Sequence, residues 1–279
     1  MKAKSYLYHA LMAVLIVAVS VASSGCKQTK KEEQKTKTEK EKISKKEVKK
    51  DIEEVVYPLP STFEITKTLN EIGASFIISL SNEPESVDNY VTEEKQALNL
   101  GVYSADLSYA TTYNMKQYTM SYMDVSKKLV KELGITGAYK PEFVKEVKNN
   151  LDNKKRLTKL ITNSFFDTYE YMNKNGKEEL SLLVVSGSWI EAMYITTHIS
   201  ENTYHNKKIV DLIADQESTL NKLFNILEPY KTRESIKNIM DQLKPIKEIY
   251  KSRKNKNFSK EQVLTIQKTI GEVRANIIS

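Results

Sequence analysis

The chain has 279 residues, of which 40% are hydrophobic and 28% charged, with one cysteine and a formal net charge of +7. That length allows one substantial core or two, and a single cysteine excludes an internal disulfide or a CxxC redox pair. From Val55 onward, 30 basic residues face 28 acidic ones and only +2 remains, which argues against a nucleic-acid-binding body.

The first 25 residues have the layout of a secretory signal peptide. Lys2 and Lys4 supply positive charge ahead of an apolar stretch that runs from Ala10 to Val19. A membrane-spanning helix needs about 20 apolar residues, so this stretch is too short to cross a bilayer. Small residues follow it, as cleavage requires, and we assign residues 1–25 to a signal peptide.

Cys26 follows Ser24 and Gly25 directly, and this junction resembles a bacterial lipobox. The resemblance implies that lipid is attached to the Cys26 thiol, with acyl chains such as palmitate, and that the chain is cleaved just before it. Ser23 replaces the large aliphatic residue usual three places before the cysteine, a departure that lipoproteins of Bacteroidetes tolerate. Two or more acyl chains hold a protein stably on a bilayer. The alternatives are a secreted protein with a free thiol and an uncleaved membrane anchor.

Residues 26–56 are expected to form a hydrated spacer between the lipid and the body. From Lys27 to Glu54 the chain contains 11 lysines and 8 acidic residues, for a net charge of +3. A segment with so few apolar residues cannot bury enough surface to fold by itself. The body is therefore assigned to residues 57–279.

The first half of the body has helical patterns. Ser61 and Glu64 have the spacing of a capping box, which predicts the start of a helix. The apolar segment Ala74–Leu80 either continues that helix or forms a short strand, and we favour the helix. Thr92 then opens a long element in which apolar residues recur every three or four positions as far as Leu133, so we expect one long helix there.

The second half of the body continues the helical pattern with short loops. Leu180 to His198 is apolar nearly all round, which predicts the central helix of a bundle. Other helices are expected to start at Pro141, to span 157–172 and 209–227, to start at Thr232 with a kink at Pro245, and to start at the cap formed by Ser259 and Gln262. We predict an all-α bundle of about eight helices.

No motif for metal, nucleotide or covalent catalysis is present. His198 and His205 lie seven positions apart and form no HxxxH or HExxH pair, and neither GxGxxG nor GxxxxGK[ST] occurs. The Gly-x-Ser at Gly187 lies in a helical pattern and lacks the strand-turn-helix context of a nucleophile elbow. We therefore expect no cofactor, no metal and no nucleic-acid partner.

Two acidic residues in apolar surroundings mark a candidate pocket. Glu191 lies between Ile190 and Ala192, and Asp106 lies among tyrosines; a buried carboxyl group must be paired or have its pKa raised. If the two helices face each other, the pocket residues are Tyr103, Asp106, Tyr109, Tyr113, Asn114, Trp189, Glu191, Tyr194 and His198. The alternative is an internal hydrogen-bond network in which the same residues are structural.

Three segments carry a further resemblance: YPLPSTFEITKTLNEIGASF, ALNLGVYSADLSYATTYNMKQ and SLLVVSGSWIEAMYITTHIS. They resemble parts of an uncharacterised group of helical lipoproteins from Bacteroidetes, over roughly residues 57–203. The resemblance implies a helical fold and a lipid anchor but no activity. Lys27 stands where an aspartate retains lipoproteins at the inner membrane in other Gram-negative bacteria, so the analogy implies the outer membrane, facing either the periplasm or the exterior.

The sequence thus predicts a lipid-anchored protein of the cell envelope, without enzymatic activity, that acts as an interaction or scaffold module for a protein partner. A small-molecule binding or sensing lipoprotein that uses the tyrosine-rich helices is the alternative. A more distant alternative is an enzyme in which Asp106 and Glu191 form an acid/base pair, since two carboxyl groups in different environments can divide these roles.

Overall fold

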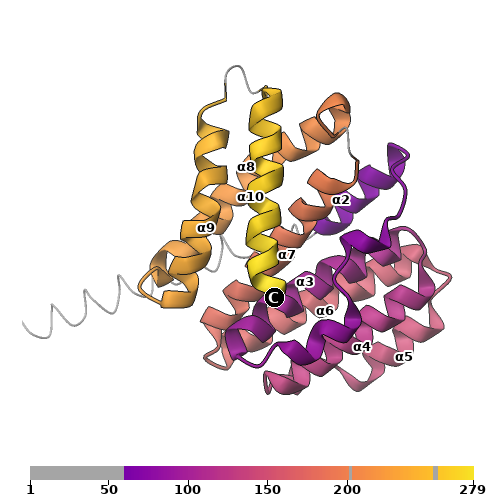
Figure 1. The fold of residues 1–279 in the computed structure, drawn as a ribbon. Helices are drawn as coiled ribbons and strands as arrows, with labels where there is room; N and C mark the ends of the chain where they lie inside the picture. Colours follow the sequence, from indigo (N-terminus) through magenta and orange to yellow (C-terminus); the bar gives the residue numbers. More distant parts are fainter. Residues whose placement is uncertain (1–59, 201–202, 254–256) are drawn as a thin grey trace, which may run out of the picture. The chain divides into compact units, whose positions relative to one another are not determined.

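Every regular element in the described part of the chain is a helix (Figure 1). The computed structural model describes residues 60–200, 203–253 and 257–279, all within the compact unit 51–279; the predicted signal peptide, Cys26 and the spacer lie outside these ranges. The α-helices in these ranges are α2 (Pro60–Glu71), α3 (Glu93–Thr112), α4 (Lys116–Glu132), α5 (Pro141–Asn149), α6 (Lys154–Lys174), α7 (Glu178–His198), α8 (Lys207–Leu227), α9 (Glu234–Lys251) and α10 (Lys260–Ile278). Short 3-10 helices are η1 (Ile78–Leu80), η2 (Pro84–Asn89), η3 (Thr136–Ala138), η4 (Thr203–His205) and η5 (Glu228–Tyr230). The predicted all-α class is confirmed.

Helix α7 is the central helix of the bundle, as its apolar sequence predicted. It packs against α2, α3, α6, α8, α9 and α10, and Figure 1 shows it in the middle of the molecule. In the described ranges α7 is the one helix long and apolar enough to cross a membrane, but 94% of its apolar window is buried inside the bundle. Its hydrophobicity is therefore that of a core helix.

Two glycines allow α3 and α7 to cross at very short distance. A Cβ atom on Gly101 would lie 2.0 Å from the carbonyl oxygen of Val184, and one on Gly187 would lie 2.0 Å from the carbonyl oxygen of Leu98. Because only a hydrogen fits at these positions, backbone packs directly on backbone, and residues further along both helices are brought face to face.

The long helix expected from Thr92 to Leu133 is wrong, because the chain turns between α3 and α4. Asn114 adopts a left-handed conformation with φ 59°. The N–H of Met115 donates to the carbonyl of Ala110 at 2.8 Å, and that of Asn114 donates to Thr111 at 3.1 Å. This is a Schellman motif with asparagine in the position where glycine is usual. The bundle thus has nine α-helices in its described ranges, not eight.

The helix favoured for Ala74–Leu80 is also wrong, and no strand forms there. Gly73 has φ 82°, and the Ala74 N–H donates to the carbonyl of Leu69, which ends α2. The chain then runs extended to Ile77, whose N–H donates to the Tyr109 hydroxyl at 2.9 Å, before η1 begins. The Tyr109 side chain thus accepts the backbone hydrogen bond that a neighbouring strand would otherwise accept.

Several predicted helix boundaries are confirmed. Thr92 caps α3 by accepting a hydrogen bond from the Lys95 N–H, and Ser259 and Gln262 form a complete capping box on α10. Helix α9 continues through Pro245. The capping box predicted at Ser61 lies outside the side chains that the structure describes.

Candidate functional site

The crossing of α3 and α7 brings Asp106 and Glu191 together in the core. Both side chains are fully buried, and the negative charge of Glu191 lies close enough to raise the pKa of Asp106. The N–H of Asn82, just after η1, donates to Oδ2 of Asp106 at 3.1 Å. The two helices therefore pack against each other, which was the condition on which the candidate pocket depended.

Arg274 on α10 is the third member of this site, and it is not among the residues predicted from the sequence. Its Nε donates to Glu191 Oε2 at 2.6 Å and its Nη2 to Glu191 Oε1 at 2.9 Å, a two-pronged ion pair. The same Nη2 also donates to the carbonyl of Leu80 at 3.1 Å. The available signal was its position four residues after Ile270, on the apolar side of the helix. We call Asp106, Glu191 and Arg274 the buried charge cluster.

The charges of this cluster balance only if Asp106 is neutral. Glu191 and Arg274 compensate each other, so an ionised Asp106 would add a lone buried negative charge. Burial raises the pKa of Asp106 well above its usual value, and the negative charge of Glu191 raises it further; Arg274 and the Asn82 N–H offset part of this. Its Oδ1 is buried and has no hydrogen-bond partner in the described chain, which fits a protonated oxygen better than an ionised one.

Tyr194 and His198 extend the cluster along α7. The Arg274 guanidinium lies 4.1 Å from the centroid of the Tyr194 ring, a cation–π contact, and the His198 ring stacks on the same tyrosine with centroids 4.1 Å apart. His198 Nδ1 lies 2.9 Å from the carbonyl of Tyr194 and donates to it. Burial lowers the pKa of His198, and the positive charge of Arg274 lowers it further, so this imidazole is neutral at pH 7.

Two of the candidate tyrosines are bonded to backbone. The Tyr103 hydroxyl donates to the carbonyl of Glu83 at 2.8 Å, and burial raises the pKa of Tyr103 above its usual value. The Tyr109 hydroxyl accepts the Ile77 N–H, and burial raises the pKa of Tyr109 to about 12. Neither phenol is suited to exchange a proton near neutral pH. Both fix the segment between α2 and α3.

The other candidate residues lie in different surroundings. Tyr113 packs edge-on against Tyr109 with centroids 5.0 Å apart, and Asn114 is exposed at the turn after α3. Trp189 is buried, and its Nε1 has no hydrogen-bond partner in the described chain. The structure thus gathers Asp106, Glu191, Tyr194 and His198 around Arg274, in the form of an internal network.

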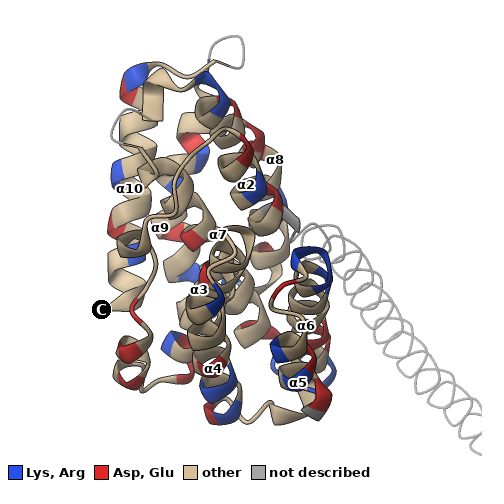
Figure 2. Ribbon diagram, turned by 90° about the vertical axis from the view of Figure 1, so that its right-hand side faces the viewer, with Lys and Arg blue, Asp and Glu red and all other residues tan. Residues whose placement is uncertain are grey.

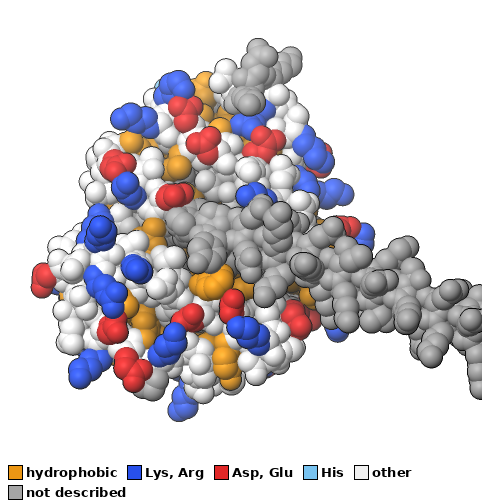
Figure 3. All heavy atoms as spheres, turned by 180° about the vertical axis from the view of Figure 1, so that it is seen from behind, with side chains coloured by type: hydrophobic (Ala, Val, Ile, Leu, Met, Phe, Trp, Pro, Cys, Tyr) orange, Lys and Arg blue, Asp and Glu red, His pale blue; other side chains and the backbone are white. Residues whose placement is uncertain are grey.

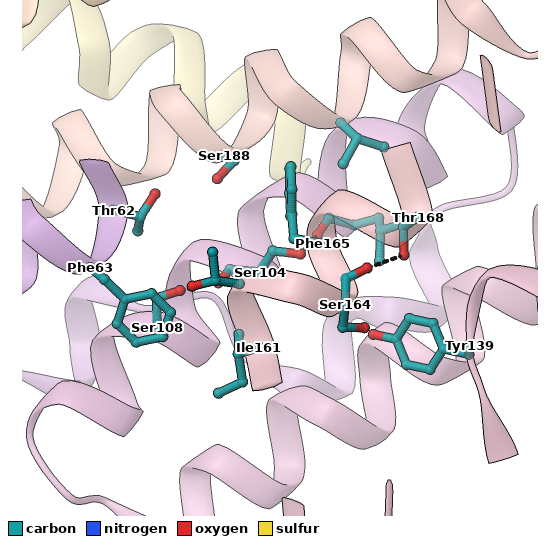
Figure 4. A pocket seen from close by; sticks show the side chains of 13 residues that line it. Thr62, Phe63, Ser104, Ser108, Tyr139, Ile161, Ser164, Phe165, Thr168 and Ser188 are labelled. Carbon is teal, nitrogen blue, oxygen red and sulfur yellow. Dashed lines mark hydrogen bonds between the residues drawn. The ribbon is translucent and has the colours of Figure 1, made fainter. Parts of the chain in front are cut away.

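A cavity lies beside this network, between α2, α3, α6 and α7 (Figure 4). Hydroxyl groups dominate its polar lining: Thr62, Ser104, Ser108, Tyr139, Thr162, Ser164, Thr168 and Ser188. Its room for the centres of water-sized molecules is about 30 Å³, and one water needs roughly 10–15 Å³. The buried Thr62 hydroxyl, which has no partner in the described chain, lines it. The cavity therefore fits about two waters and is far below the roughly 300 Å³ of a small-molecule pocket.

Comparisons with known proteins identify no relative of this chain. No family model, no curated protein and no solved structure matches the chain. Within the described residues, no group of three His, Cys, Asp or Glu side chains is arranged to hold a metal ion. The chemistry of the site therefore has to be argued from the buried charge cluster itself, which joins α10 to α3, α7 and the segment after η1.

Proposed function

We propose that this protein is a lipid-anchored helical module of the cell envelope, held on the outer membrane through Cys26, that binds a protein partner and catalyses no reaction. The observation that carries this proposal is that the carboxyl groups of the buried charge cluster are shielded from solvent and already engaged by neighbouring groups. Asp106 and Glu191 are the carboxyl groups best placed for acid/base chemistry, yet both are fully buried and engaged by Arg274 and by backbone. Their role is to fasten helices together.

The accessible surface supports a polar mode of partner binding. In the described ranges only three large apolar side chains are exposed: Ile78 at 41%, Val91 at 81% and Leu264 at 47%. Figure 3 shows a face on which basic and acidic side chains alternate and apolar ones occupy small separate areas. A partner therefore binds through charges and hydrogen bonds more than through a broad apolar patch. The small-molecule alternative has less support, because the hydroxyl-lined cavity has room only for water.

The anchor is tested by intact-mass measurement on protein extracted from membranes. We expect a chain that begins at residue 26 and carries the added mass of a lipidated cysteine, whereas Cys26→Ser yields no lipidated form. A native chain that begins at Met1, or a bare residue 26, would overturn the anchor.

The scaffold role is tested by crosslinking in cells, with the native chain compared with Cys26→Ser exported by the same leader. We expect one discrete covalent complex with an envelope protein, reduced several-fold without the anchor at equal protein level. The variant Asp106→Asn should form the same complex, because the carboxyl group is structural. Absence of any complex, or its loss in Asp106→Asn at unchanged stability, would contradict the proposal.

A further inference from the structure

Positive charge is concentrated where α5 ends and α6 begins. Between Lys140 and Lys159 there are seven basic and three acidic residues, a net of +4 (7 − 3). The chain from Val55 onward carries +2 in total, so the rest of it is −2 (2 − 4). Six lysines of this stretch are exposed, and one of them, Lys140, is ion-paired with Asp167. We call the other five the basic corner: Lys145, Lys148, Lys154, Lys155 and Lys159. In Figure 2 blue residues gather at one end of α6.

Two of the three acidic residues in this stretch are already paired, and the third, Glu142, is exposed in the first turn of α5. Glu146 on α5 accepts a hydrogen bond from Arg156 on α6 at 2.7 Å, which holds the two helices together. Asp152, in the loop between them, is ion-paired with Lys116. None of the five lysines makes an ion pair within the described ranges. Their charges therefore remain available to an external anion.

The arrangement works against the stability of α6. Lys154, Lys155 and Arg156 fill its first turn, which contains no acidic residue. The free N–H groups there make that end of a helix positive, so cations in the first turn are unfavourable. Helix α7, by contrast, begins with Glu178 and Glu179. Lysines that oppose the helix dipole and make no internal ion pair to offset that cost are expected at functional surfaces.

The chain enters the body next to this helix. Thr62 and Phe63, in the first turn of α2, line the same cavity as Ile161 and Phe165 of α6 (Figure 4). The 33 residues 27–59 separate Cys26 from α2. If this spacer behaves as the coil expected from its sequence, its ends would be about 30–35 Å apart, which would allow the body to reach the bilayer that holds Cys26.

We propose that the basic corner docks on the phosphate headgroups of the bilayer that holds the lipid of Cys26; this rests on the proposed anchoring. Exposed lysines without partners match phosphate in charge, and each lysine close to an anionic bilayer strengthens binding about fivefold. Docking orients the body with α5 and the start of α6 against the membrane. Helices α9 and α10, which both views place on the other side of α7, then face away and are free for a partner (Figures 1 and 2).

The test measures binding to lipid vesicles by the mature polypeptide with Cys26→Ser, so that acylation plays no part. Vesicles contain about 30% phosphatidylglycerol in phosphatidylcholine, or phosphatidylcholine alone. The variant Lys154→Glu/Lys155→Glu is compared with Lys208→Glu/Lys260→Glu, which also reverses two exposed lysines in the first turns of helices, α8 and α10. Both pairs change the net charge equally and place acidic residues where the helix dipole favours them.

We expect the α6 pair to lower partitioning into anionic vesicles at least about tenfold, and the control pair less than about threefold. The neutral variant Lys154→Gln/Lys155→Gln should give an intermediate loss, and all three variants should keep or raise the melting temperature. Equal losses in both pairs would mean that net charge alone acts and would overturn the proposal. Unchanged binding, or equal binding to neutral vesicles, would also overturn it and point to an acidic protein partner. A bare Cys26 in native protein would refute the anchor but leave the vesicle result standing.

Discussion

Asp106 is a carboxyl group that the fold keeps protonated. Its raised pKa follows from burial and from the adjacent negative charge of Glu191. Because the folded state holds this proton more tightly than the unfolded state, the associated stability is fully present below the usual pKa of about 4. It is lost as the pH rises through the folded value.

The variant Asp106→Asn should therefore flatten this pH dependence. Its amide oxygen can accept the Asn82 N–H, as Oδ2 of Asp106 does, and the amide cannot ionise. We expect its free energy of unfolding, relative to the native chain, to rise by on the order of 1–3 kcal/mol between pH 4 and pH 8. Urea unfolding at several pH values measures this, with exposed Asp211→Asn as control. Parallel pH profiles for Asp106→Asn and the native chain would show that Asp106 is ionised.

At the scale of single residues, the sequence identified the acidic half of the cluster but not the basic half. Glu191 was conspicuous because Ile190 and Ala192 flank it in an apolar helix. Arg274 lies in a helix with many charged neighbours, where an arginine is ordinary. Its burial depends on how α10 docks against α7. The two clues were its position four residues after Ile270, on the apolar side of the helix, and a buried carboxyl group that needs a counter-ion.

At the scale of elements, the α3–α7 crossing sets the geometry of the core. The positions of Gly101 and Gly187 leave space for a hydrogen only, since an added methyl group would overlap a carbonyl oxygen of the facing helix. Backbone cannot move aside as the tip of a flexible side chain can. The distance between the two helices therefore depends on both glycines.

Alanine at either position should destabilise the bundle. We expect Gly101→Ala and Gly187→Ala each to cost about 3 kcal/mol or more, because the helices must separate along their length. The matched control is Gly271→Ala in α10, where the nearest atom to an added Cβ is His198 Nε2 at 3.5 Å. That substitution should be neutral or stabilising by up to about 1 kcal/mol, from helix propensity. Chemical denaturation measures all three, and equal effects would refute the close crossing.

The sequence predicted the existence of helices better than their ends. Apolar residues continue at helical spacing from α3 into α4, so periodicity alone could not reveal the break at Asn114. An asparagine is a weaker sequence signal for a helix end than a glycine is. Gly134 and Gly176, which adopt the left-handed conformation where their helices end, are the residues expected there. The segment after Gly73 was misread because a tyrosine hydroxyl from α3 satisfies its backbone.

At the scale of the whole molecule, α10 joins the two ends of the body. Arg274 reaches Glu191 across 83 positions and the Leu80 carbonyl across 194, and the Asn99 side chain donates to the carbonyl of Ile277 at 3.0 Å. With one cysteine in the chain, no internal disulfide can hold these parts together. The bundle depends on packing and on this long-range ion pair.

Replacing one partner of the Glu191–Arg274 ion pair should lower the free energy of unfolding more than replacing both. We expect Glu191→Gln or Arg274→Met alone to lower the free energy of unfolding by about 3–5 kcal/mol, because each leaves an uncompensated buried charge. The double variant Glu191→Gln/Arg274→Met should recover a large part of that loss. Thermal unfolding of the native chain, the two single variants and the double variant gives a double-mutant cycle. Additive losses would show that the two side chains do not interact.

The distance between Glu191 and Arg274 along the chain also fixes when folding can finish. A ribosome that adds about 5–20 residues per second needs roughly 4–17 seconds to make the 83 positions that separate them. Until then the acidic group at the centre of α7 lacks its counter-ion, so an incomplete chain cannot close its interior. If the chain is exported, as we propose, this ion pair can form only after α10 has been made.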